Sequence, residues 1–279
     1  MTAPEKAVLR VGIGGLGTVG LPVARWLDGS GIGELEAGLR LTAVASGNQD
    51  RARENIAGFN TPVPLVGLAE LADLCDVIVE CAPPDKFQDI AEPAIKAGRV
   101  FMPISVTSLL NRMDLIDTAR ETGARIIVPT GALLGLDALR AAALGTIQSV
   151  TMITRKPPGG LKKAPFVIEQ GIDLDGLKEP KKLFQGPVSE AAAKFPANVN
   201  VAVALGLAGI GPDKTQYEVW AGPGVTRNIH TIKVDADTVA FEMTIANVPT
   251  GDNPATGKLV PLSVIETLRG MVTPFKVGT

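Results

Sequence analysis

A glycine-rich segment near the start of the chain has the spacing of a nucleotide-binding turn. The run LRVGIGGLGTVG contains the pattern G-x-G-x-x-G twice, through Gly12, Gly14 and Gly17 and through Gly15, Gly17 and Gly20. In such a turn the first glycine allows a tight bend, the second lets the backbone approach a pyrophosphate, and the third lets the helix pack closely on the strand. The pattern predicts a dinucleotide site, and a turn without a ligand is the simpler alternative.

The second of the two overlapping patterns agrees better with its neighbours. It leaves Val11 and Ile13 in an apolar strand and begins the next helix near Thr18. The first N–H groups of that helix and the positive end of its dipole attract a phosphate. We therefore predict that NAD or NADP contacts five consecutive residues: Gly15, Leu16, Gly17, Thr18 and Val19.

The end of the second predicted strand bears on which dinucleotide is used. NAD sites usually have an Asp or Glu there to hold the ribose 2′-hydroxyl. Here the strand ends in Ala45-Ser46-Gly47-Asn48, without an acid, and Arg51 and Arg53 follow. Arginines beside small polar groups suit a 2′-phosphate at least as well, so the choice between NAD and NADP stays open.

His230 is the only histidine in the chain. In the strand-like run NIHTIKV it shares a side with Ile232 and Val234, which predicts that it faces the covered side of a sheet, where a cleft between domains would lie. Such a histidine is either a core residue bonded to a backbone carbonyl or a general base, because the ordinary pKa of imidazole lies near neutrality. Position alone leaves both interpretations open.

Other polar residues stand where they can bind an anionic substrate or the cofactor. Asn198 and Asn200 precede a helix of small residues, where an amide either caps the helix or binds a carboxamide or carboxylate. The segment PTGALLGLD (129–137) offers backbone N–H groups at another helix start. Arg155 and Lys156 follow a strand and either pair with substrate carboxylates or form a solvated strand end.

The elements that would position these residues divide the chain into two parts. In the first half, short apolar runs alternate with helical patterns, which indicates a parallel sheet covered on both faces. The predicted strands are Leu9–Ile13, Leu41–Ala45, Val77–Val79, Val100–Val106 and Arg125–Val128, and the predicted helices are Val19–Leu27, Ile90–Ala97 and Leu109–Glu121.

After about residue 147 the pattern changes to strands with period-two alternation, at Ser149–Thr154, Tyr217–Trp220, Asn228–Val234 and Thr238–Ile245. We therefore predict an α/β fold with a Rossmann-type parallel-sheet domain for dinucleotide binding over residues 1–130. A second α+β domain with a largely antiparallel sheet is predicted over residues 131–255. The tail, 256–279, contains a helical pattern at Leu262–Met271 and is expected to pack back on the first domain.

Composition excludes several other classes of protein. The 279 residues suit about two domains, and 27 Lys and Arg against 29 Asp and Glu leave no basic surplus for nucleic acid or an anionic membrane. The uncharged run Phe195–Pro212 is too broken for a membrane span, and the N-terminus has no apolar signal segment. Cys75 and Cys81 with a single histidine predict neither a disulfide nor a metal site, and we expect a cytoplasmic protein.

Seven segments spread over nearly the whole chain carry a family resemblance. They are GLGTVG (15–20), VIVECA (77–82), PTGALLGLDAL (129–139), TRKPPGGL (154–161), FPANVNVAVALGLAGIGPDKT (195–215), RNIHTIKV (227–234) and DNPATGKL (252–259). In these segments the sequence resembles the L-aspartate dehydrogenase family, and the last four are specific to that family rather than general to Rossmann enzymes.

The resemblance implies an NAD(P)-dependent oxidoreductase that interconverts L-aspartate and iminosuccinate, or oxaloacetate plus ammonia, with a role in NAD biosynthesis. It implies that His230 is the catalytic acid and base. It also implies that Ala132, through its backbone N–H, and Asn200 contact the cofactor, and that the second domain binds substrate and forms a homodimer. Asn198, Arg155 and Lys156 are weaker candidates for holding the substrate carboxylates.

Two alternatives stay open. One is another two-domain NAD(P) oxidoreductase, similar to dihydrodipicolinate reductase or homoserine dehydrogenase, although the paired histidines expected of the former are absent. The other is a dinucleotide-binding redox sensor without turnover, against which the presence of His230 argues.

Overall fold

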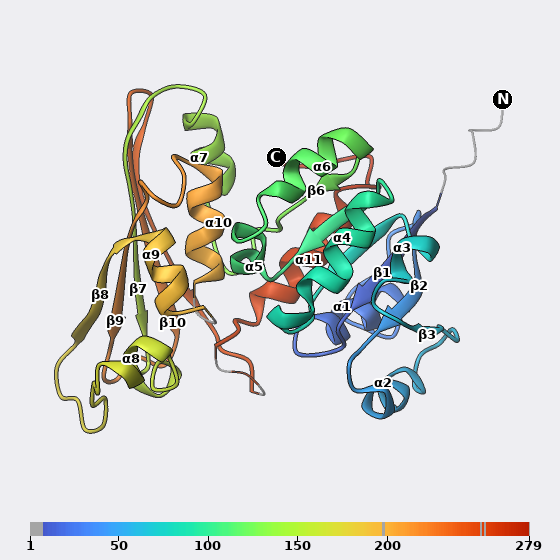
Figure 1. Cartoon of the computed structure of the whole chain (residues 1–279), viewed down its shortest axis with the longest axis horizontal. Helices are drawn as coiled ribbons and strands as arrows, with labels where there is room; N and C mark the ends of the chain where they lie inside the picture. Colours follow the sequence, from blue (N-terminus) through green and yellow to red (C-terminus); the bar gives the residue numbers. More distant parts are fainter. Residues whose placement is uncertain (1–7, 197–198, 252, 254, 279) are drawn as a thin grey trace. The chain divides into compact units, whose positions relative to one another are not determined.

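The computed structural model describes residues 8–196, 199–251, 253 and 255–278. The chain forms two compact units (Figure 1). The first consists of Met1–Pro129 and Pro261–Val277, and the second of Thr130–Val260 and Gly278–Thr279. One has a parallel sheet and the other a mostly antiparallel sheet, which confirms the predicted fold class.

The first unit is built on a parallel sheet in which the strand order is β3-β2-β1-β4-β5-β6. The direction in which successive strands are added reverses between β1 and β4, and ligands of such sheets bind beyond the carboxyl ends of the strands at this point. The strands are β1 (Leu9–Gly14), β2 (Leu39–Ala45), β3 (Leu65–Val66), β4 (Val77–Glu80), β5 (Val100–Pro103) and β6 (Arg125–Ile126).

Helices cover both faces of this sheet, which is why its central strands are apolar on both sides. On one face Val77 and Val79 of β4 pack with α1 and α11, and on the other Ile78 packs with α3, α4 and α6. The helices are α1 (Gly20–Leu27), α2 (Gln49–Ile56), α3 (Leu71–Leu74), η1 (Pro84–Lys86), α4 (Phe87–Lys96), α5 (Val106–Leu110), α6 (Asp114–Thr122) and α11 (Leu259–Arg269).

Two predictions for this unit were wrong: one strand ends earlier than predicted, and one predicted helix is two helices. The strand predicted to reach Val106 ends at Pro103, because the backbone N–H and hydroxyl of Ser105 turn to the carboxylate of Glu80 and the chain enters α5. The single helix predicted over 109–121 is two helices, α5 and α6, separated by a turn. In that turn Arg112 pairs with Asp114, the first residue of α6.

The second unit contains a five-stranded sheet with the order β11-β10-β7-β9-β8. Strands β7 and β9 run parallel, and the other neighbours are antiparallel. The strands are β7 (Ile147–Lys156), β8 (Lys181–Pro187), β9 (Gln216–Ala221), β10 (Asn228–Ala236) and β11 (Ala240–Asn247). The helices are α7 (Leu136–Ala142), η2 (Pro158–Gly160), α8 (Pro165–Glu169), α9 (Val188–Lys194) and α10 (Asn200–Ala208).

Strand β8 was not predicted from the sequence. Its run, KKLFQGP, has two lysines, a glycine and a proline, and it pairs only with β9 at the edge of the sheet. Lysine and proline are common on edge strands, where one side needs no hydrogen-bonding partner. The pattern therefore lacks the β-branched, alternating character by which a strand is recognised in sequence.

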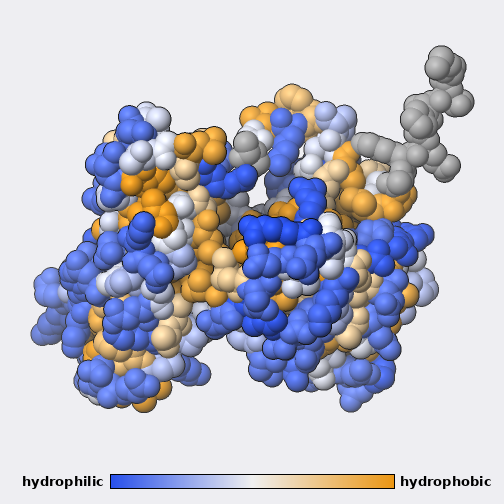
Figure 2. Space-filling model, turned by 45° about the horizontal axis from the view of Figure 1, so that its top comes forward, coloured by the Kyte–Doolittle hydropathy of each residue, from blue (hydrophilic) through white to orange (hydrophobic). Residues whose placement is uncertain are grey.

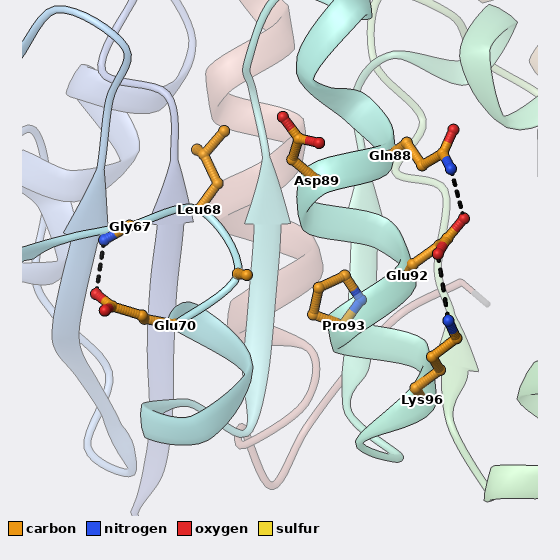
Figure 3. A pocket seen from close by; sticks show the side chains of 9 residues that line it. Gly67, Leu68, Glu70, Gln88, Asp89, Glu92, Pro93 and Lys96 are labelled. Carbon is orange, nitrogen blue, oxygen red and sulfur yellow. Dashed lines mark hydrogen bonds and ion pairs between the residues drawn. The ribbon is translucent and has the colours of Figure 1, made fainter.

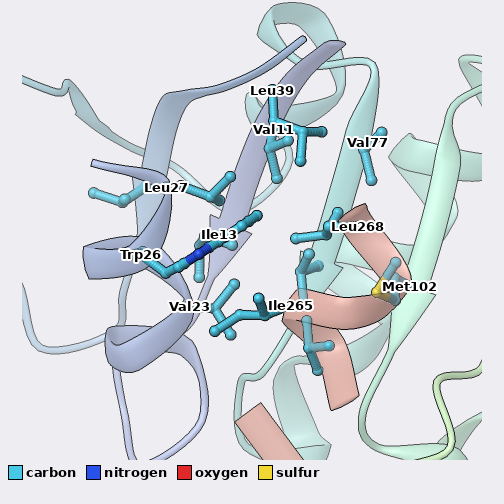
Figure 4. Close-up of a cluster of buried hydrophobic side chains, with 14 of the residues drawn as sticks. Val11, Ile13, Val23, Trp26, Leu27, Leu39, Val77, Met102, Ile265 and Leu268 are labelled. Atoms are coloured by element: carbon cyan, nitrogen blue, oxygen red, sulfur yellow. The ribbon is translucent and has the colours of Figure 1, made fainter. Parts of the chain in front are cut away.

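Helix α11 belongs to the core of the first unit, although the long stretch of the second unit that begins at Thr130 lies between it and the rest of the first unit in sequence. Val264 and Leu268 are fully buried there, together with Val23 and Ile13. Figure 4 shows Ile265 of α11 directed toward Val23. The C-terminal segment therefore closes one face of the parallel sheet.

Polar side chains dominate the surface seen in Figure 2, and hydrophobic ones lie between them. Among the described residues, no helix is both long and apolar enough to cross a bilayer.

We predict that Leu268→Ala lowers the free energy of unfolding of the first unit by about 2–5 kcal/mol, because it leaves a cavity in a packed core. Leu262→Ala on the same helix is the control, since Leu262 is 45% exposed, and a change within about 0.5 kcal/mol is expected. The chain has two tryptophans, so in a Trp220→Phe background the fluorescence of Trp26 reports urea unfolding of this unit. Equal effects of the two leucine changes would contradict the packing of α11.

Candidate active site

The turn after β1 gives each glycine of the second pattern a separate structural role. Gly15 has φ +103°, and a Cβ there would lie 2.5 Å from the carbonyl oxygen of Cys81. A Cβ on Gly20 would lie 1.8 Å from the carbonyl oxygen of Gly15. A Cβ on Gly17 would meet nothing within 4 Å. Gly15 and Gly20 are thus required by the fold, whereas Gly17 leaves an open backbone surface of the kind that a pyrophosphate approaches.

The other residues of this turn contribute mainly through the backbone. Leu16 is buried in the core of the first unit, while Thr18 and Val19 are half-buried. The amide of Leu21 donates to the carbonyl of Gly17, which joins the turn to the first residues of α1. The structure therefore keeps Gly15–Val19 together as one turn at the start of a helix.

Glu80 lies beside this turn and was missed by the sequence analysis. It ends β4, is paired with Gly14 of β1, and is fully buried. Its carboxylate accepts hydrogen bonds from the N–H of Ala82 at 3.0 Å and from the N–H and hydroxyl of Ser105 at 3.0 and 2.9 Å. Burial raises the pKa of Glu80 to about 7, against the opposing effect of these hydrogen bonds. One carboxylate thus ties together the loops that follow β4 and β5.

The loop after β2 is also ordered by its own side chains. The side chain of Asn48 caps α2 by accepting from the N–H of Arg51 at 3.0 Å. Arg53 is held by Asp50 at 2.9 Å and by Gln49 at 3.1 Å. Both arginines are exposed, but the guanidinium of Arg53 is already engaged by Asp50 and Gln49, so a 2′-phosphate would compete with these contacts at Arg53.

A surface pocket of the first unit lies between the loop after β3 and one face of α4 (Figure 3). The carboxylate of Glu92 accepts from both Gln88 and Lys96, and that of Glu70 accepts from the N–H of Gly67. None of the predicted site residues lines this pocket. Its acidic character does not suit the phosphates of a dinucleotide.

In the second unit a set of buried polar residues lies on one face of the sheet. His230 of β10 is paired directly with Thr154 of β7, and Nδ1 of His230 lies 2.9 Å from Oγ1 of Thr154. Tyr217 of β9 is joined to Thr154 by a further side-chain hydrogen bond. We call these residues, with two buried neighbours, the polar cluster: Thr154, Lys156, Tyr217, Asn228 and His230.

Burial sets the protonation states in the polar cluster. Burial and, to a smaller extent, the charge of Lys156 lower the pKa of His230 to about 3. Burial lowers the pKa of Lys156 to about 8 and raises that of Tyr217 to about 12. At neutral pH, His230 is therefore a neutral imidazole with one unprotonated ring nitrogen, next to a lysine that is mostly an ammonium ion.

The structure separates the two basic residues that follow one another on β7. Lys156 is 3% exposed and shares its face with Thr154, whereas Arg155 points to the opposite face. There the guanidinium of Arg155 lies 6.0 Å from the ring centre of Trp220. Of the pair, only Lys156 belongs to the polar cluster that contains His230.

The remaining predicted residues of the second unit lie at turns. Ala132 is buried, and its carbonyl accepts from Asn247 at 2.8 Å, which anchors the glycine turn before α7. Asn200 is the first residue of α10 and is half-buried. Asn198 lies outside the described residues. Within those residues, no group of three or more His, Cys, Asp or Glu side chains is suited to hold a metal ion.

The sequence contained signals for some of the residues that were missed. Glu80 is a single charge at the carboxyl end of an otherwise apolar strand, a position from which a side chain reaches the ligand side of a parallel sheet. Thr154 and Tyr217 gave no such signal, because threonine and tyrosine are ordinary strand residues. Only the tertiary structure shows that Thr154 lies opposite His230 and is bonded both to His230 and to Tyr217.

Two family models match the two halves of the chain. The family described as homoserine dehydrogenase, NAD binding domain, matches residues 15–129. The family described as aspartate dehydrogenase, C-terminal, matches residues 137–271, which include the whole polar cluster. The first match assigns an NAD-binding domain, and the second is specific to one kind of dehydrogenase.

Similar proteins match over almost the full length. An L-aspartate dehydrogenase of Bradyrhizobium diazoefficiens is 50% identical, over 97% of this chain and 94% of the relative. L-aspartate dehydrogenase 3 of Bordetella bronchiseptica is 48% identical over 99% of both chains. The crystal structure of aspartate dehydrogenase from Thermotoga maritima has the same fold, with 24% identity, a TM-score of 0.72 and coverage of 97% of this chain and 99% of that one. The chain therefore belongs to the L-aspartate dehydrogenase family of NAD(P)-dependent oxidoreductases.

Proposed function

We propose that this protein is an L-aspartate dehydrogenase, which interconverts L-aspartate and iminosuccinate, or oxaloacetate plus ammonia after hydrolysis. The observation that carries the proposal is a neutral, buried imidazole at His230 with its Nδ1 bonded to Thr154 and with Lys156 nearby. This arrangement lies in the unit that matches aspartate dehydrogenases specifically. A general NAD-binding domain alone would not favour one substrate over another.

The cofactor-binding roles fall to the turn after β1 and to two positions of the second unit. The open surface at Gly17 receives the pyrophosphate, and Gly15 and Gly20 hold the turn in shape. Leu16, Thr18 and Val19 complete that turn, while the N–H of Ala132 and the amide of Asn200 contact the nicotinamide part. When bound, the nicotinamide ring supplies the acceptor or donor of a hydride.

The amine of aspartate has to be neutral before its carbon can release a hydride, because the nitrogen lone pair forms the new C=N bond. His230 takes the proton from the substrate ammonium and returns it in the reverse direction. The imidazolium can give this proton to the imine nitrogen, and the neutral imidazole so formed can then remove a proton from the water that attacks the imine carbon. Its burial also keeps bulk water away from the reacting nitrogen.

Lys156 is proposed to bind a carboxylate of the substrate. Its ammonium group lowers the pKa of His230, which disfavours proton uptake while the site is empty. A bound dicarboxylate brings negative charge to both residues, and this favours the imidazolium form. Substrate binding thus converts a weak base into a stronger one. Asn198 is retained as a weaker candidate for the second carboxylate, and Arg155 is not, because it faces away.

We also propose that the second unit forms a homodimer through its sheet and that the enzyme acts in the cytoplasm, with a role in NAD biosynthesis. In support of a reducing compartment, Cys75 and Cys81 are both free thiols. Light scattering of the purified chain measures its oligomeric state, and a monomer would contradict the proposed homodimer.

His230→Asn is expected to lower kcat by about 10²–10⁴, the usual contribution of a general base. The assay follows the absorbance of NADH or NADPH with oxaloacetate and ammonia, and with L-aspartate in the other direction. Asparagine retains a polar group for Thr154, and the affinity for NADH should stay unchanged. Turnover at the wild-type rate would refute the role of His230, and absence of turnover in the wild type would favour a redox sensor.

Succinate, a dicarboxylate without an amine, should inhibit competitively and bind more weakly as the pH rises through about 8. The reason is that Lys156, whose pKa is lowered to about 8, is an ammonium ion below this pH and loses its charge above it. Lys156→Gln should raise the inhibition constant at pH 7 and abolish its pH dependence. A pH-independent constant in the wild type would show that Lys156 does not bind the carboxylate.

Gly17→Val should raise the dissociation constants of NADH and NADPH at least about tenfold, because the added side chain occupies the surface that a pyrophosphate approaches. The melting temperature should change little, since a Cβ at Gly17 meets no neighbour. Gly20→Ala is the matched comparison, because its Cβ would collide with the carbonyl oxygen of Gly15, and it should destabilise the first unit. Calorimetric titration with both cofactors measures the affinities and also decides between NAD and NADP. Unchanged affinities in Gly17→Val would place the pyrophosphate elsewhere.

A further inference from the structure

Three side chains of adjacent strands form a buried row of hydrogen bonds that ends at His230. Oγ1 of Thr154 lies 2.9 Å from Nδ1 of His230, and Thr154 is also bonded to the side chain of Tyr217. Thr154 is fully buried, Tyr217 is 1% exposed and His230 is 3% exposed. The hydroxyl of Thr154 therefore stands between the phenol and the imidazole, away from bulk water.

A hydroxyl has one proton, so this row has two possible directions. In one, Tyr217 donates to Thr154 and Thr154 donates to Nδ1, which places the ring proton of His230 on Nε2. In the other, Nδ1–H donates to Thr154 and Thr154 donates to the oxygen of Tyr217, which leaves the lone pair on Nε2. The direction of the row thus decides which ring nitrogen of His230 can accept a proton.

We propose that Thr154 is a positioning residue that holds His230 in the Nδ1–H tautomer by accepting from Nδ1–H and donating its own proton to Tyr217, so that Nε2 is the proton acceptor. Nδ1 and Thr154 already share one hydrogen bond, so Nε2 is the nitrogen that stays available to a substrate. The catalytic meaning of this inference rests on the proposed function of His230. The tautomer itself is a property of the protein without substrate.

The protonated form of His230 favours this direction. An imidazolium carries a proton on both ring nitrogens and is a donor at each of them. Thr154 can therefore stay bonded to Nδ1 of the imidazolium only as an acceptor, and its own proton is then directed to its other partner, Tyr217.

The proton transfer that follows is balanced without any rearrangement of the row. An N–H bond of the substrate ammonium breaks, its electron pair stays on the amine nitrogen, and a new N–H bond forms at Nε2. Nδ1 keeps its proton and its bond to Thr154, so the imidazolium is stabilised by a contact that already exists. In the opposite direction of the row, Nε2 would carry a proton in the resting state and could not accept one.

Nitrogen NMR measures the tautomer directly, and this chain is well suited because His230 is its only histidine. With ¹⁵N-histidine and the purification tag removed, the imidazole gives one pair of signals, which need no assignment. At neutral pH we expect a pyrrole-type shift at Nδ1 and a pyridine-type shift at Nε2. The reverse pair of shifts in the wild type would overturn the proposal, whatever the enzyme's activity.

Thr154→Val keeps the shape of the side chain and removes the hydroxyl. The tautomer should then move toward Nε2–H, and kcat should fall by about 10–100-fold, the size of effect seen when a partner that orients a metal-bound imidazole is lost. Thr154→Ser should retain both the tautomer and the turnover. Thr231→Val is the matched control, because Thr231 is the next residue of β10, points to the other face and is bonded to Thr244 at 2.8 Å.

The outcomes separate this inference from the proposed function. A wild-type Nδ1–H tautomer that Thr154→Val leaves unchanged would show that another group fixes the ring, and would refute the role of Thr154. If the tautomer changes in Thr154→Val, Thr154 controls the tautomer of His230. If His230→Asn then retains full turnover, His230 is not the general base, and the proposed catalytic role is refuted. Loss of turnover in both Thr154→Val and Thr154→Ser, with the melting temperature lowered in each, would mean that Thr154 acts only on stability.

Discussion

A sheet that buries polar side chains has to provide each of them with a hydrogen-bonding partner, because an unpaired polar group in the interior costs about 1–3 kcal/mol. Among the described residues, no buried side-chain nitrogen or oxygen lacks a partner. On the covered face of the second sheet, this requirement ties His230 to Thr154 and Thr154 to Tyr217. The hydrogen bond to Thr154 fixes the orientation of the imidazole, and burial keeps the imidazole neutral.

The same burial has opposite effects on the neighbouring groups. It disfavours charge on His230 and Lys156, lowering both pKa values, and it keeps Tyr217 protonated. A low dielectric also makes each remaining charge more effective. The dicarboxylate proposed as substrate would supply the negative charge that the polar cluster itself does not contain.

In the first unit the limiting constraint is the close approach of backbones at the carboxyl ends of β1 and β4. There is no room for a side chain at Gly15, against the carbonyl of Cys81, or at Gly20, against the carbonyl of Gly15. Glu80 holds the adjoining loops through Ala82 and Ser105. Gly17, where a Cβ would meet nothing within 4 Å, is therefore the open position of the turn.

The sequence by itself determined the fold class, the glycine turn and the face on which His230 lies, because each depends on local spacing: period two in a strand, or a short glycine pattern between a strand and a helix. Local spacing did not predict features that depend on a residue distant in sequence, such as the end of a strand or a hydrogen bond between two strands. The strand predicted to continue to Val106 ends early because Ser105 turns to Glu80, and the partnership of Thr154 with His230 spans 76 residues. Only the tertiary structure sets the strand register, and hydrogen bonds across strands depend on which residues that register places opposite one another.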